Sequence, residues 1–526
     1  MITLTIDGIA VSVPDGSTVL EAAAEAGVKI PTLCYLKDIN QIGACRMCLV
    51  EIEGAKALQA ACVMPAGEGM KVHTNSKVVA DARRTVLELL VSDHNVECLS
   101  CERNQKCELQ TLCEDYGVDQ HKYGGKLHPG EPDNVAPAVL RDPSKCVLCR
   151  RCVAACGNMQ KIYVIDAIDR GFKTQIGAPF HKSLGDVDCI NCGQCIIACP
   201  VGALYEKDST EDVWAALRDP NKKVIFQTAP AVRVALGEEF GMPMGSRVTG
   251  KMAAAIRRLG AFRTFDTDFA ADLTIMEEGT ELLQRLENGG KLPMITSCSP
   301  GWIKFCEHKY HDFLDNLSTC KSPHEMMGAV LKSYFARKND IDPKDIFVVS
   351  VMPCTAKKFE ATRPELSKDG LQDVDAVLTT RELARMIKQA NIDFVKLPDE
   401  PFDDMLGDST GAAIIFGATG GVMEAALRTV ADILTGQDLQ QLDYTDVRGV
   451  EGVKEATVTI GDLDVKVAVA HGMAAAQDLL NSIREGKADY HFIEVMGCPG
   501  GCVNGGGQPI VSADLRNHVD IRVERA

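Results

Sequence analysis

Hydrophobic and polar positions alternate at the start of the chain. The stretch "ITLTIDGIAVSV" changes polarity along its length and turns at Asp7-Gly8, which predicts a β-hairpin. "STVLEAAAEAG" follows and predicts a short helix, with Thr18 and Glu21 spaced as a capping box and Gly27 placed as its stop. We therefore expect a strand pair and a helix at the N-terminus.

After residue 210 the pattern becomes one of alternating strands and helices. "LTTRELARMIKQA" predicts an amphipathic helix, with Thr379 and Glu382 in capping-box spacing. "GATGGVMEAAL" lacks the pattern of a phosphate-binding loop and is expected to be a tight strand-to-helix turn. Buried strands that run into loops or helices, in an α/β arrangement, are expected in "KKVIFQTAPAVRVAL", "KLPMITSC", "DIFVVSVMPC" and "GAAIIFGATGG".

Length and composition narrow the class of protein. The chain has 526 residues, which suggests three or four domains, and its 46% hydrophobic and 25% charged content is that of an ordinary globular protein. No run is long enough to span a bilayer, and the N-terminus has no basic and apolar export signal, so we expect a cytoplasmic protein. A net charge of −17 argues against a nucleic-acid partner.

The chain has 22 cysteines, and most of them fall in C-x-x-C units. Without an export signal, such cysteines are expected to bind metal rather than form disulfides. Cys34, Cys45, Cys48 and Cys62 fit a [2Fe-2S] cluster or a structural zinc ion. The hairpin and helix before them resemble the β-grasp fold of plant-type [2Fe-2S] ferredoxins, although the first cysteine gap is longer here.

A second candidate set comprises His94, Cys98, Cys101 and Cys107. A helix that carries Leu87, Leu89 and Leu90 is expected to place His94 just ahead of the three thiols, and zinc would suit this spacing equally well. The segment resembles the His-ligated [4Fe-4S] region shared by the large subunit of respiratory NADH dehydrogenases and iron-only hydrogenases, which implies an iron–sulfur cluster. Cys113 is expected not to be a ligand.

The motif C-x2-C-x2-C-x3-C occurs twice, in "CVLCRRCVAAC" and "CINCGQCIIACP". This is the chain's one clear internal repeat, and it matches the run of bacterial two-cluster ferredoxins, in which the fourth cysteine of each run crosses to the other cluster. The sequence therefore predicts one [4Fe-4S] cluster on Cys146, Cys149, Cys152 and Cys199, and another on Cys156, Cys189, Cys192 and Cys195.

Three peptides at predicted strand ends carry further cysteines: "TSCSPGW" at 296–302, "MPCTAKKFE" at 352–360 and "EVMGCPGGCVNGGGQP" at 494–509. Loops at strand ends are where α/β domains place their sites, and glycines around Cys498 and Cys502 allow the backbone to approach a large group. Cys354, Cys498 and Cys502 are thus placed as ligands that converge on one cluster.

These peptides are similar to the three signatures of the catalytic domain of iron-only ([FeFe]) hydrogenases, and the resemblance covers essentially the whole chain. It implies reversible interconversion of H2 with protons and electrons at an H-cluster. That cofactor is a [4Fe-4S] cluster joined by a shared cysteine sulfur to a diiron centre with CO, cyanide and a dithiolate bridge. The modular plan resembles the clostridial type, or the catalytic subunit of NAD(P)-linked multi-subunit hydrogenases.

The resemblance implies an α+β multidomain protein with four parts. A [2Fe-2S] domain is expected at 1–78, a His-ligated [4Fe-4S] domain at 79–137, a two-cluster ferredoxin domain at 138–209 and an α/β catalytic domain at 210–526. The implied partners are ferredoxin, or diaphorase-type subunits that bind NAD(P) and flavin, together with separate maturation proteins. The chain itself has no nucleotide-binding G-x-G-x-x-G after a strand.

The resemblance also assigns roles to residues of the catalytic part. Cys354, Cys498 and Cys502 match ligands of the cubane, with Cys502 as the bridge to the diiron centre. Lys357 matches a lysine that holds a cyanide by a charge-assisted hydrogen bond, and Met352 and Met496 match methionines packed on the diiron unit.

One position departs from the family pattern. The first signature normally reads T-S-C-C-P, with a proton-passing cysteine followed by a cubane ligand, whereas this chain has Cys298 and then Ser299. A serine oxygen, a shifted Cys298 or only three thiolates could serve the cubane. Because Glu278, Glu281, Ser318 and Arg285 match the family's relay to solvent, we expect Cys298 to remain the proton carrier.

Two smaller departures are Ala231, where clostridial relatives carry a serine, and an end about twenty residues after the third signature. A helical C-terminal extension is expected to be absent, trimmed or supplied by a partner. Two other functions compete with hydrogenase activity. A hydrogen sensor is disfavoured by Cys298, and an electron-transfer subunit without an H-cluster is favoured only by Ser299.

Overall fold

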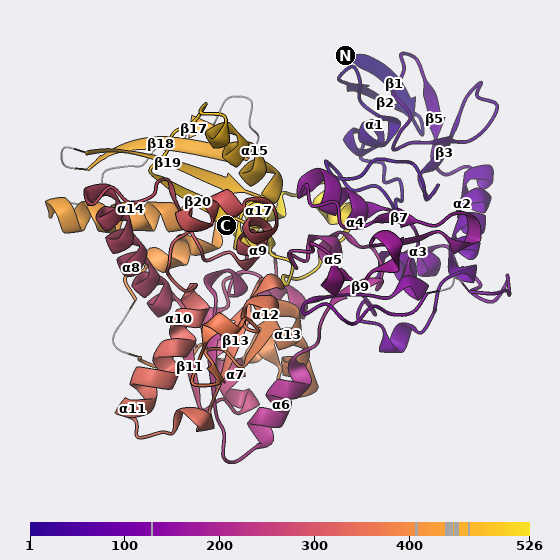
Figure 1. The fold of residues 1–526 in the computed structure, drawn as a ribbon. Helices are drawn as coiled ribbons and strands as arrows, with labels where there is room; N and C mark the ends of the chain where they lie inside the picture. The colour runs from indigo at the N-terminus through magenta and orange to yellow at the C-terminus, as the bar shows by residue number, and fades with distance from the viewer. Residues whose placement is uncertain (128–129, 406–408, 437–444, 447–451, 461–462) are drawn as a thin grey trace.

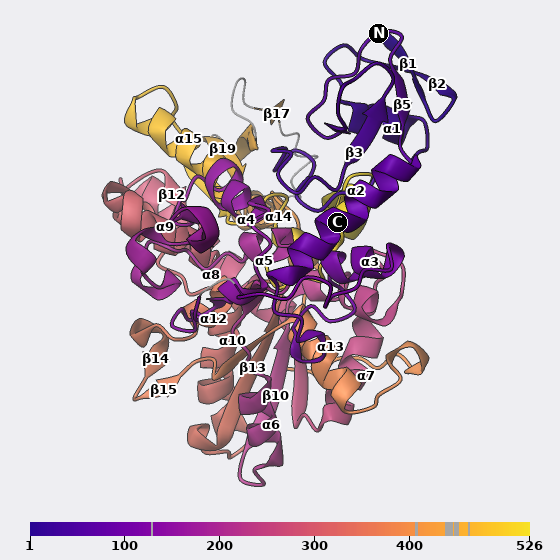
Figure 2. The ribbon, with the colours of Figure 1, turned by 90° about the vertical axis from the view of Figure 1, so that its right-hand side faces the viewer.

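The computed structural model describes residues 1–127, 130–405, 409–436, 445–446, 452–460 and 463–526. The N-terminal modules lie on one side of the molecule and the larger C-terminal part on the other (Figure 1). Turned by 90°, the N-terminal sheet stands farthest from the catalytic part, and the ferredoxin-like helices α4 and α5 lie between them (Figure 2). None of the described helices is both long and apolar enough to cross a membrane.

The N-terminal hairpin and helix are confirmed. Strands β1 and β2 pair in antiparallel register through a turn in which Asp7 and Gly8 both have positive φ. Thr18 caps helix α1 with the reciprocal bonds of a capping box to Glu21, and Gly27 follows the helix with a φ of +70°. The strands lie in the order β2-β1-β5-β3-β4. The bounds are β1 Ile2–Ile6, β2 Ile9–Val13, α1 Val19–Glu25, β3 Leu49–Ile52, β4 Gln59–Ala60 and β5 Lys71–His73.

Helices α2 and α3 follow, and after them the two short helices α4 and α5 with four short strands. Helix α2 ends just before His94, as predicted, and packs against β3 and α3. Helices α4 and α5 each begin after a residue in left-handed conformation, Arg150 and Gly193, which reflects the repeated cysteine motif. The bounds are α2 Lys77–Ser92, α3 Glu108–Asp115, β6 Val139–Arg141, α4 Arg151–Ala154, β7 Asp166–Ile168, β8 Gln175–Gly177, α5 Gln194–Ala198 and β9 Leu204–Glu206.

The catalytic part contains a parallel sheet in the order β11-β10-β13-β16, so the expected α/β arrangement is confirmed. Its strands are apolar on both faces because helices cover both, and Phe226 and Val349 are fully buried. Thr379 and Glu382 form the predicted capping box of α13. The bounds are α6 Thr210–Arg218, β10 Lys223–Thr228, α7 Thr249–Leu259, β11 Arg263–Asp266, α10 Pro323–Val330, α11 Ala336–Lys338, β13 Ile346–Met352, α12 Ala356–Glu360, β14 Ser367–Lys368, β15 Leu371–Gln372, β16 Ala376–Thr379 and α13 Thr380–Gln389.

A second sheet has the order β12-β20-β19-β18-β17, with β12, β20 and β19 parallel and β18 antiparallel to β19. Successive residues of β20 face opposite sides: Phe492 packs with α8 and α14, and Ile493 packs with α9 and α15. The bounds are α8 Asp268–Glu287, β12 Met294–Ile295, α9 Pro300–Lys309, α14 Gly421–Thr435, β17 Thr445–Asp446, β18 Val453–Ile460, β19 Leu463–His471, α15 Met473–Arg484, β20 Phe492–Met496, α16 Ala513–Arg516 and α17 Ile521–Arg525.

One strand prediction is wrong. "GAAIIFGATGG" forms the 3-10 helix η14, Ala412–Gly417, and not a strand. Ala413 and Phe416 point inward while Ile414 and Ile415 between them are exposed, which is a helical spacing. A short apolar run does not distinguish a strand from a helical turn. Gly420, with a φ of +89°, does lead into α14, but this turn follows a 3-10 helix and not the expected strand.

Candidate active site

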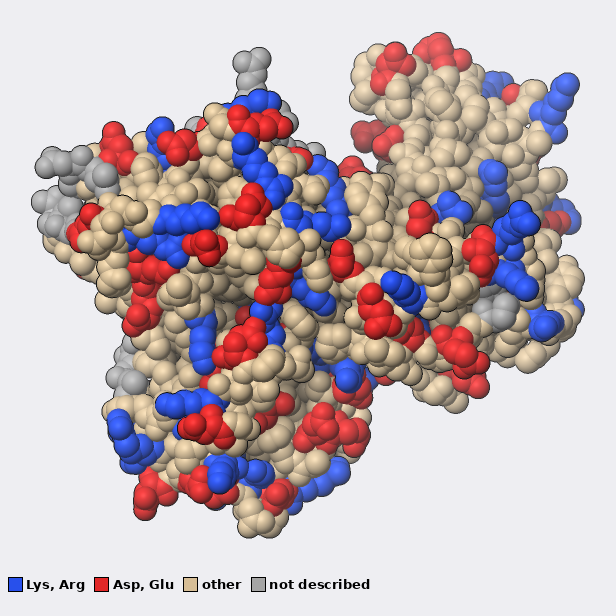
Figure 3. All heavy atoms as spheres, in the orientation of Figure 1, with Lys and Arg blue, Asp and Glu red and all other residues tan. Residues whose placement is uncertain are grey.

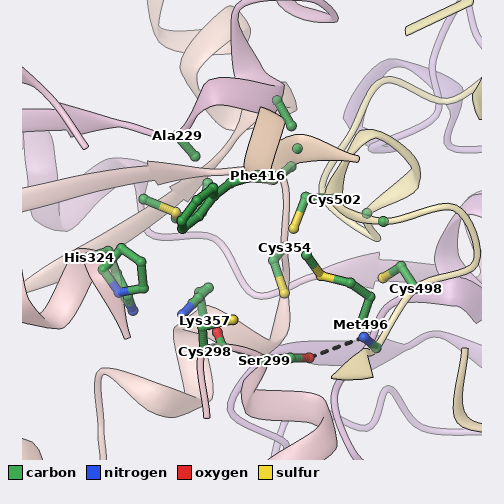
Figure 4. A pocket seen from close by; sticks show the side chains of 18 of the residues that line it. Ala229, Cys298, Ser299, His324, Cys354, Lys357, Phe416, Met496, Cys498 and Cys502 are labelled. Carbon is green, nitrogen blue, oxygen red and sulfur yellow. Dashed lines mark hydrogen bonds between the residues drawn. The ribbon is translucent and has the colours of Figure 1, made fainter. Parts of the chain in front are cut away.

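A cavity lies where the carboxyl ends of the two sheets meet, with an empty volume of about 950 Å³ that is partly open to solvent. The three cysteine-bearing peptides all reach it, from the ends of β12, β13 and β20 (Figure 4). Apolar side chains and backbone atoms form most of its walls. The predicted site residues on this wall are Cys298, Ser299, Met352, Cys354, Lys357, Met496, Cys498 and Cys502.

Cys354, Cys498 and Cys502 lie on one side of the cavity, and Cys298 and Lys357 lie nearer to His324 (Figure 4). Burial raises the pKa of Cys354, raises that of Cys502 to about 12 and raises that of Cys498 well above its usual value. Buried thiols of this kind become thiolates only with a cation to hold, so the donor set fits an iron–sulfur cluster.

Ser299 lies beside the third peptide. Its Oγ accepts a hydrogen bond from the Gly497 N–H at 3.2 Å, and it is the residue that precedes helix α9. A Cβ atom on Gly497 would stand 2.9 Å from this oxygen, so the two peptides approach each other closely here. Ser299 thus lies beside the peptide that carries Cys498 and presents an oxygen there.

Lys357 is held from two sides. Its Nζ donates to the Glu360 carboxylate at 2.7 Å and to the backbone carbonyl of Cys298 at 3.0 Å. Burial disfavours its charge, but Glu360 outweighs this and raises the pKa of Lys357. Glu360 also accepts from His324, whose Nε2 lies 2.6 Å from the same oxygen and whose Nδ1 lies 3.0 Å from Ser350 Oγ. The cation at the cavity wall is therefore fixed in place and stays charged.

The apolar wall is formed by Met352 at the end of β13, Met496 at the end of β20 and Phe416 of η14. Ala231 lies on the same wall, and its carbonyl accepts from Gln508 Nε2 at 2.8 Å. The methyl side chain of Ala231 offers no hydrogen bond to a ligand. Together these side chains exclude water from one end of the cavity.

The predicted relay residues lie near one another beside α8, although neither carboxylate oxygen of Glu278 has a hydrogen-bond partner within the described residues. Glu278 is fully buried, and burial raises its pKa to about 7, against the Ser318 hydroxyl and the Ser297 N–H, which favour the charged form. Ser318 Oγ donates to Glu281 at 3.2 Å, and Arg285 holds the other oxygen of Glu281 at 2.6 Å. Burial, followed by the nearby Glu278, raises the pKa of Cys298 well above its usual value.

The accessory cysteines are brought together in sets. In the Cys34 set (Cys34, Cys45, Cys48, Cys62), Cys48 Sγ and Cys62 Sγ lie 3.3 Å apart. In the His94 set (His94, Cys98, Cys101, Cys107), His94 Nδ1 is buried and has no hydrogen-bond partner within the described residues. Burial also lowers the pKa of His94 to about 4, so the ring is neutral and free to bind a metal.

Two smaller cavities match the ferredoxin-like repeat. One, of about 450 Å³, is lined by the Cys146 set (Cys146, Cys149, Cys152, Cys199). The other, of about 400 Å³, is lined by the Cys189 set (Cys156, Cys189, Cys192, Cys195). The structure therefore groups these cysteines in the crossed manner expected from the sequence, and each group surrounds space that a cubane would fill.

The Cys189 set lies directly against the active-site cavity, because Cys192 lines both spaces. Thr355 Oγ1 donates to the Asn191 carbonyl at 2.7 Å, and Gln160 Nε2 donates to the Gly497 carbonyl at 2.8 Å. A Cβ on Gly193 would stand 2.4 Å from Thr355 Oγ1. Only glycine permits this approach of the two modules.

Sequence reasoning missed three residues of the site: His324, Glu360 and Phe416. Glu360 could have been found, since it lies three residues after Lys357 on one short helix. His324 carried no signal, because its contacts with Ser350 and Glu360 join segments far apart in the chain. Phe416 lies in the segment for which the sequence wrongly predicts a strand, so the sequence does not predict that its side chain faces the cavity.

Among the described residues, the charged side chains do not gather into a patch of one sign on the face seen in Figure 3. On the face seen in Figure 3, acidic and basic side chains are interspersed over both the N-terminal modules and the catalytic part. The negative net charge is thus distributed rather than gathered over one element on this face.

Comparison with protein families gives four matches in chain order. They are a 2Fe-2S iron-sulfur cluster binding domain at residues 1–77, the NADH-ubiquinone oxidoreductase-G iron-sulfur binding region at 83–122, a 4Fe-4S dicluster domain at 145–203, and the C-terminal domain of the iron only hydrogenase large subunit at 222–506. The last spans more than half of the chain.

Two relatives match over nearly the full length of the chain, and a solved structure matches over part of it. The NADP-reducing hydrogenase subunit HndD of Solidesulfovibrio fructosivorans is 51% identical over 98% of this chain and 90% of its own. Iron hydrogenase 1 of Clostridium pasteurianum is 44% identical over 100% of this chain and 92% of its own. A structure of the apo [FeFe]-hydrogenase HydA1 from Chlamydomonas reinhardtii matches with a TM-score of 0.54 and 40% identity, covering 60% of this chain and 86% of that one.

Proposed function

The chain belongs to the iron-only hydrogenase family, and we propose that it interconverts H2 with protons and electrons in the cavity lined by Cys354, Cys498 and Cys502. It is an [FeFe] hydrogenase with accessory iron–sulfur domains. The observation that carries the location is the convergence of three thiols and the charged Lys357 on one cavity of sufficient size. When bound there, the H-cluster supplies the metal centre at which H2 is split or formed.

The cysteines would hold the cubane, with Cys502 as the shared ligand. Lys357 offers its ammonium to a cyanide, since Glu360 keeps it charged and the Cys298 carbonyl keeps it in place. Met352, Met496 and Phe416 keep water away. Ser299 is proposed as the residue that faces the fourth iron, because it lies beside Gly497 on the cubane side.

The proton route is proposed to run from Cys298 through Glu278, Ser318 and Glu281 to Arg285. Cys298 keeps its proton because burial raises its pKa, and Glu278 titrates at about 7, where it can both take up and release a proton. Ser318 donates to Glu281 at 3.2 Å, and the Glu281 side chain, which is 15% exposed, is held by Arg285. A proton would therefore move between buried Cys298 and Glu281 through thiol, carboxyl and hydroxyl groups, and Arg285 holds Glu281 at the outer end of the route.

The electron route is proposed to use one [2Fe-2S] cluster in the Cys34 set and three [4Fe-4S] clusters in the His94, Cys146 and Cys189 sets. The Cys189 set delivers electrons to the cavity, since Cys192 lines both. HndD is described as a subunit of an NADP-reducing hydrogenase. We propose by analogy a partner subunit that binds NAD(P), and we retain ferredoxin as the alternative acceptor and the cytoplasm as the location.

The test is an infrared spectrum and an activity assay on protein made with the maturation machinery. We expect CO and cyanide stretching bands, and H2-dependent reduction of a viologen dye by the chain alone. Reduction of NAD(P) is expected only after a partner subunit is added. Complete bands without turnover would indicate a sensor, and intact accessory clusters without bands would indicate an electron carrier.

A further inference from the structure

Arg103 carries a fixed positive charge in the interior, between the His94 set and the Cys146 set. It is 3% exposed and stands between Cys101 and Cys107 in the sequence. Its Nη2 donates to the backbone carbonyl of Cys199, in the other set. A buried guanidinium requires a compensating negative charge, because removing it from water is costly.

No carboxylate within the described residues forms an ion pair with Arg103. The neighbouring acids are engaged elsewhere: Glu102 accepts from Arg385 at 2.6 Å, and both oxygens of Glu108 accept from Arg151 at 2.9 Å. Burial and the nearby Arg381 both disfavour the charge on Arg103. Glu108 favours the charge through space, but both of its oxygens are already engaged by Arg151, so it leaves the donors of Arg103 without an acceptor.

Cysteine sulfurs are the remaining anionic groups around this side chain. Cys199 favours its charged form most, followed by Glu108 and Cys107. A Cβ atom on Gly202 would stand 2.3 Å from Cys101 Sγ and 3.6 Å from Arg103 Cγ, so the thiol and the arginine flank the same glycine.

Two of the three guanidinium nitrogens of Arg103 also lack hydrogen-bond partners among the described residues. Its Nε and Nη1 atoms are buried and have no hydrogen-bond partner in the part of the chain that the structure describes. Buried N–H groups are nearly always paired, so these donors point to an acceptor outside the polypeptide. Thiolate and sulfide sulfurs of iron–sulfur clusters are acceptors of this kind.

We propose that Arg103 is the shared counter-charge of the two clusters held by the His94 set and the Cys146 set. This inference rests on the ligand sets given under the proposed function. The guanidinium offers its free N–H groups to cluster sulfur and stabilises the more negative, reduced state of each cluster. It raises both reduction potentials together, which keeps neighbouring steps of the electron route matched.

The test is a redox titration followed by electron paramagnetic resonance on the full chain, made without diiron maturation and matched for iron and sulfide content. In Arg103→Gln, both clusters are expected to have reduction equilibrium constants at least tenfold lower, which is 59 mV for a one-electron couple. Arg103→Lys keeps the charge but not the planar fork of donors, so a smaller shift in the same direction is expected.

Arg170→Gln is the matched control, because Arg170 belongs to the same module but is exposed and does not line the cavity of the Cys146 set, so water screens its charge. In this control, the reduction potentials of both clusters are expected to equal those of the unmodified chain. Repeating Arg103→Gln in a Cys98→Ala background, which removes the His94 cluster, isolates the shift of the Cys146 cluster.

Unchanged potentials in both Arg103 variants, with full iron content, would overturn the inference and leave the ligand sets standing. A shift in only one cluster would overturn the shared role. If the unmodified chain lacks the two signals, the ligand sets themselves fail and the inference fails with them.

Discussion

Lys357 and Glu360 form an ion pair of 2.7 Å inside the catalytic part, one turn apart on α12. The same carboxylate oxygen accepts from His324 on α10 at 2.6 Å. Glu360 is thus the residue that both keeps Lys357 charged and fixes it against the wall of the cavity. The pKa of Glu360 is lowered to about 2 because Lys357 and His324 outweigh its burial.

Replacing Glu360 with Gln is expected to leave a buried lysine without its counter-charge. Breaking a buried pair in this way lowers the free energy of unfolding by about 3–5 kcal/mol. We also expect the pKa of Lys357 to fall, since burial then dominates, and H2 turnover to be lost. Chemical denaturation of the catalytic part and a viologen assay measure the two effects.

The matched control is Asp393→Asn, which removes an exposed acid from an i,i+3 pair with Lys396. Exposed pairs contribute little, so no change in unfolding is expected. Equal destabilisation by both variants would mean that the position of Lys357 does not depend on Glu360.

The second prediction concerns pH. Folding raises the pKa of Glu278 from 4.5 to about 7, so the folded protein binds a proton more strongly than the unfolded chain between these values. Stability from this group is therefore full below about pH 4.5 and is lost as the pH rises through 7. Relative to Glu278→Gln, the unmodified chain should lose about 3 kcal/mol between pH 4 and pH 8, since a pKa change of 1 is about 1.4 kcal/mol.

The measurement is the unfolding midpoint of both proteins across that range. Glu278→Gln should also reduce H2 turnover by roughly 10²- to 10⁴-fold, the usual contribution of a proton-transferring group. A constant stability difference from pH 4 to pH 8 would contradict the raised pKa, whatever the activity. Asp268 and Glu494 also have pKa values raised to about 7, but they are present in both proteins and cancel in the comparison.

The local elements and the cysteine groupings could be predicted because their signals are local. The Asp7-Gly8 turn and the capping boxes at Thr18 and Thr379 are decided within four residues. Spacing within each C-x-x-C run is also short. The common cavity of the three strand-end peptides could be predicted only through the family resemblance, because residues far apart in the chain line it.

The failures have the same physical origin. The apolar run at residues 412–417 predicts a strand only because such a run carries no period of its own. Packing on α8 and α14 decides that it is helical. His324 and Arg103 could not be interpreted from sequence, since their partners, Glu360 and Cys199, are supplied by the tertiary fold.

A third prediction tests Ser299. Replacing it with Cys places a thiol at the position proposed to face the fourth iron, and a thiolate binds iron more firmly than a serine oxygen. We expect the cubane of Ser299→Cys to lose iron more slowly to a chelator than that of the unmodified chain. Iron release, followed by absorbance in protein without the diiron unit, is the measurement.

Ser299→Ala separates the alternatives for the fourth iron. If the serine oxygen binds iron, the alanine variant should lose iron faster than the unmodified chain. Equal rates for the alanine variant and the unmodified chain would show that the cubane is held by three thiolates or by Cys298, and that the Ser299 hydroxyl serves only the Gly497 N–H.

The last prediction concerns the contact through which electrons reach the cavity. Gly193 has a φ of +68°, and a Cβ there would stand 2.4 Å from Thr355 Oγ1. Gly193→Ala therefore combines a backbone cost of about 1–2 kcal/mol with a clash that pushes the Cys189 set away from Cys354. We expect H2 to reduce the accessory clusters more slowly. Absorbance after rapid mixing with H2 measures this rate.

Gly171→Ala separates the clash from the backbone cost. Gly171 has a similar φ of +62° in the same module, but a Cβ there meets no atom within 4 Å. The control should therefore lose similar stability from the backbone and keep its rate of cluster reduction. If both variants slow equally, the rate reports the stability of the module, and the close contact of Gly193 with Thr355 is not what sets the passage of electrons.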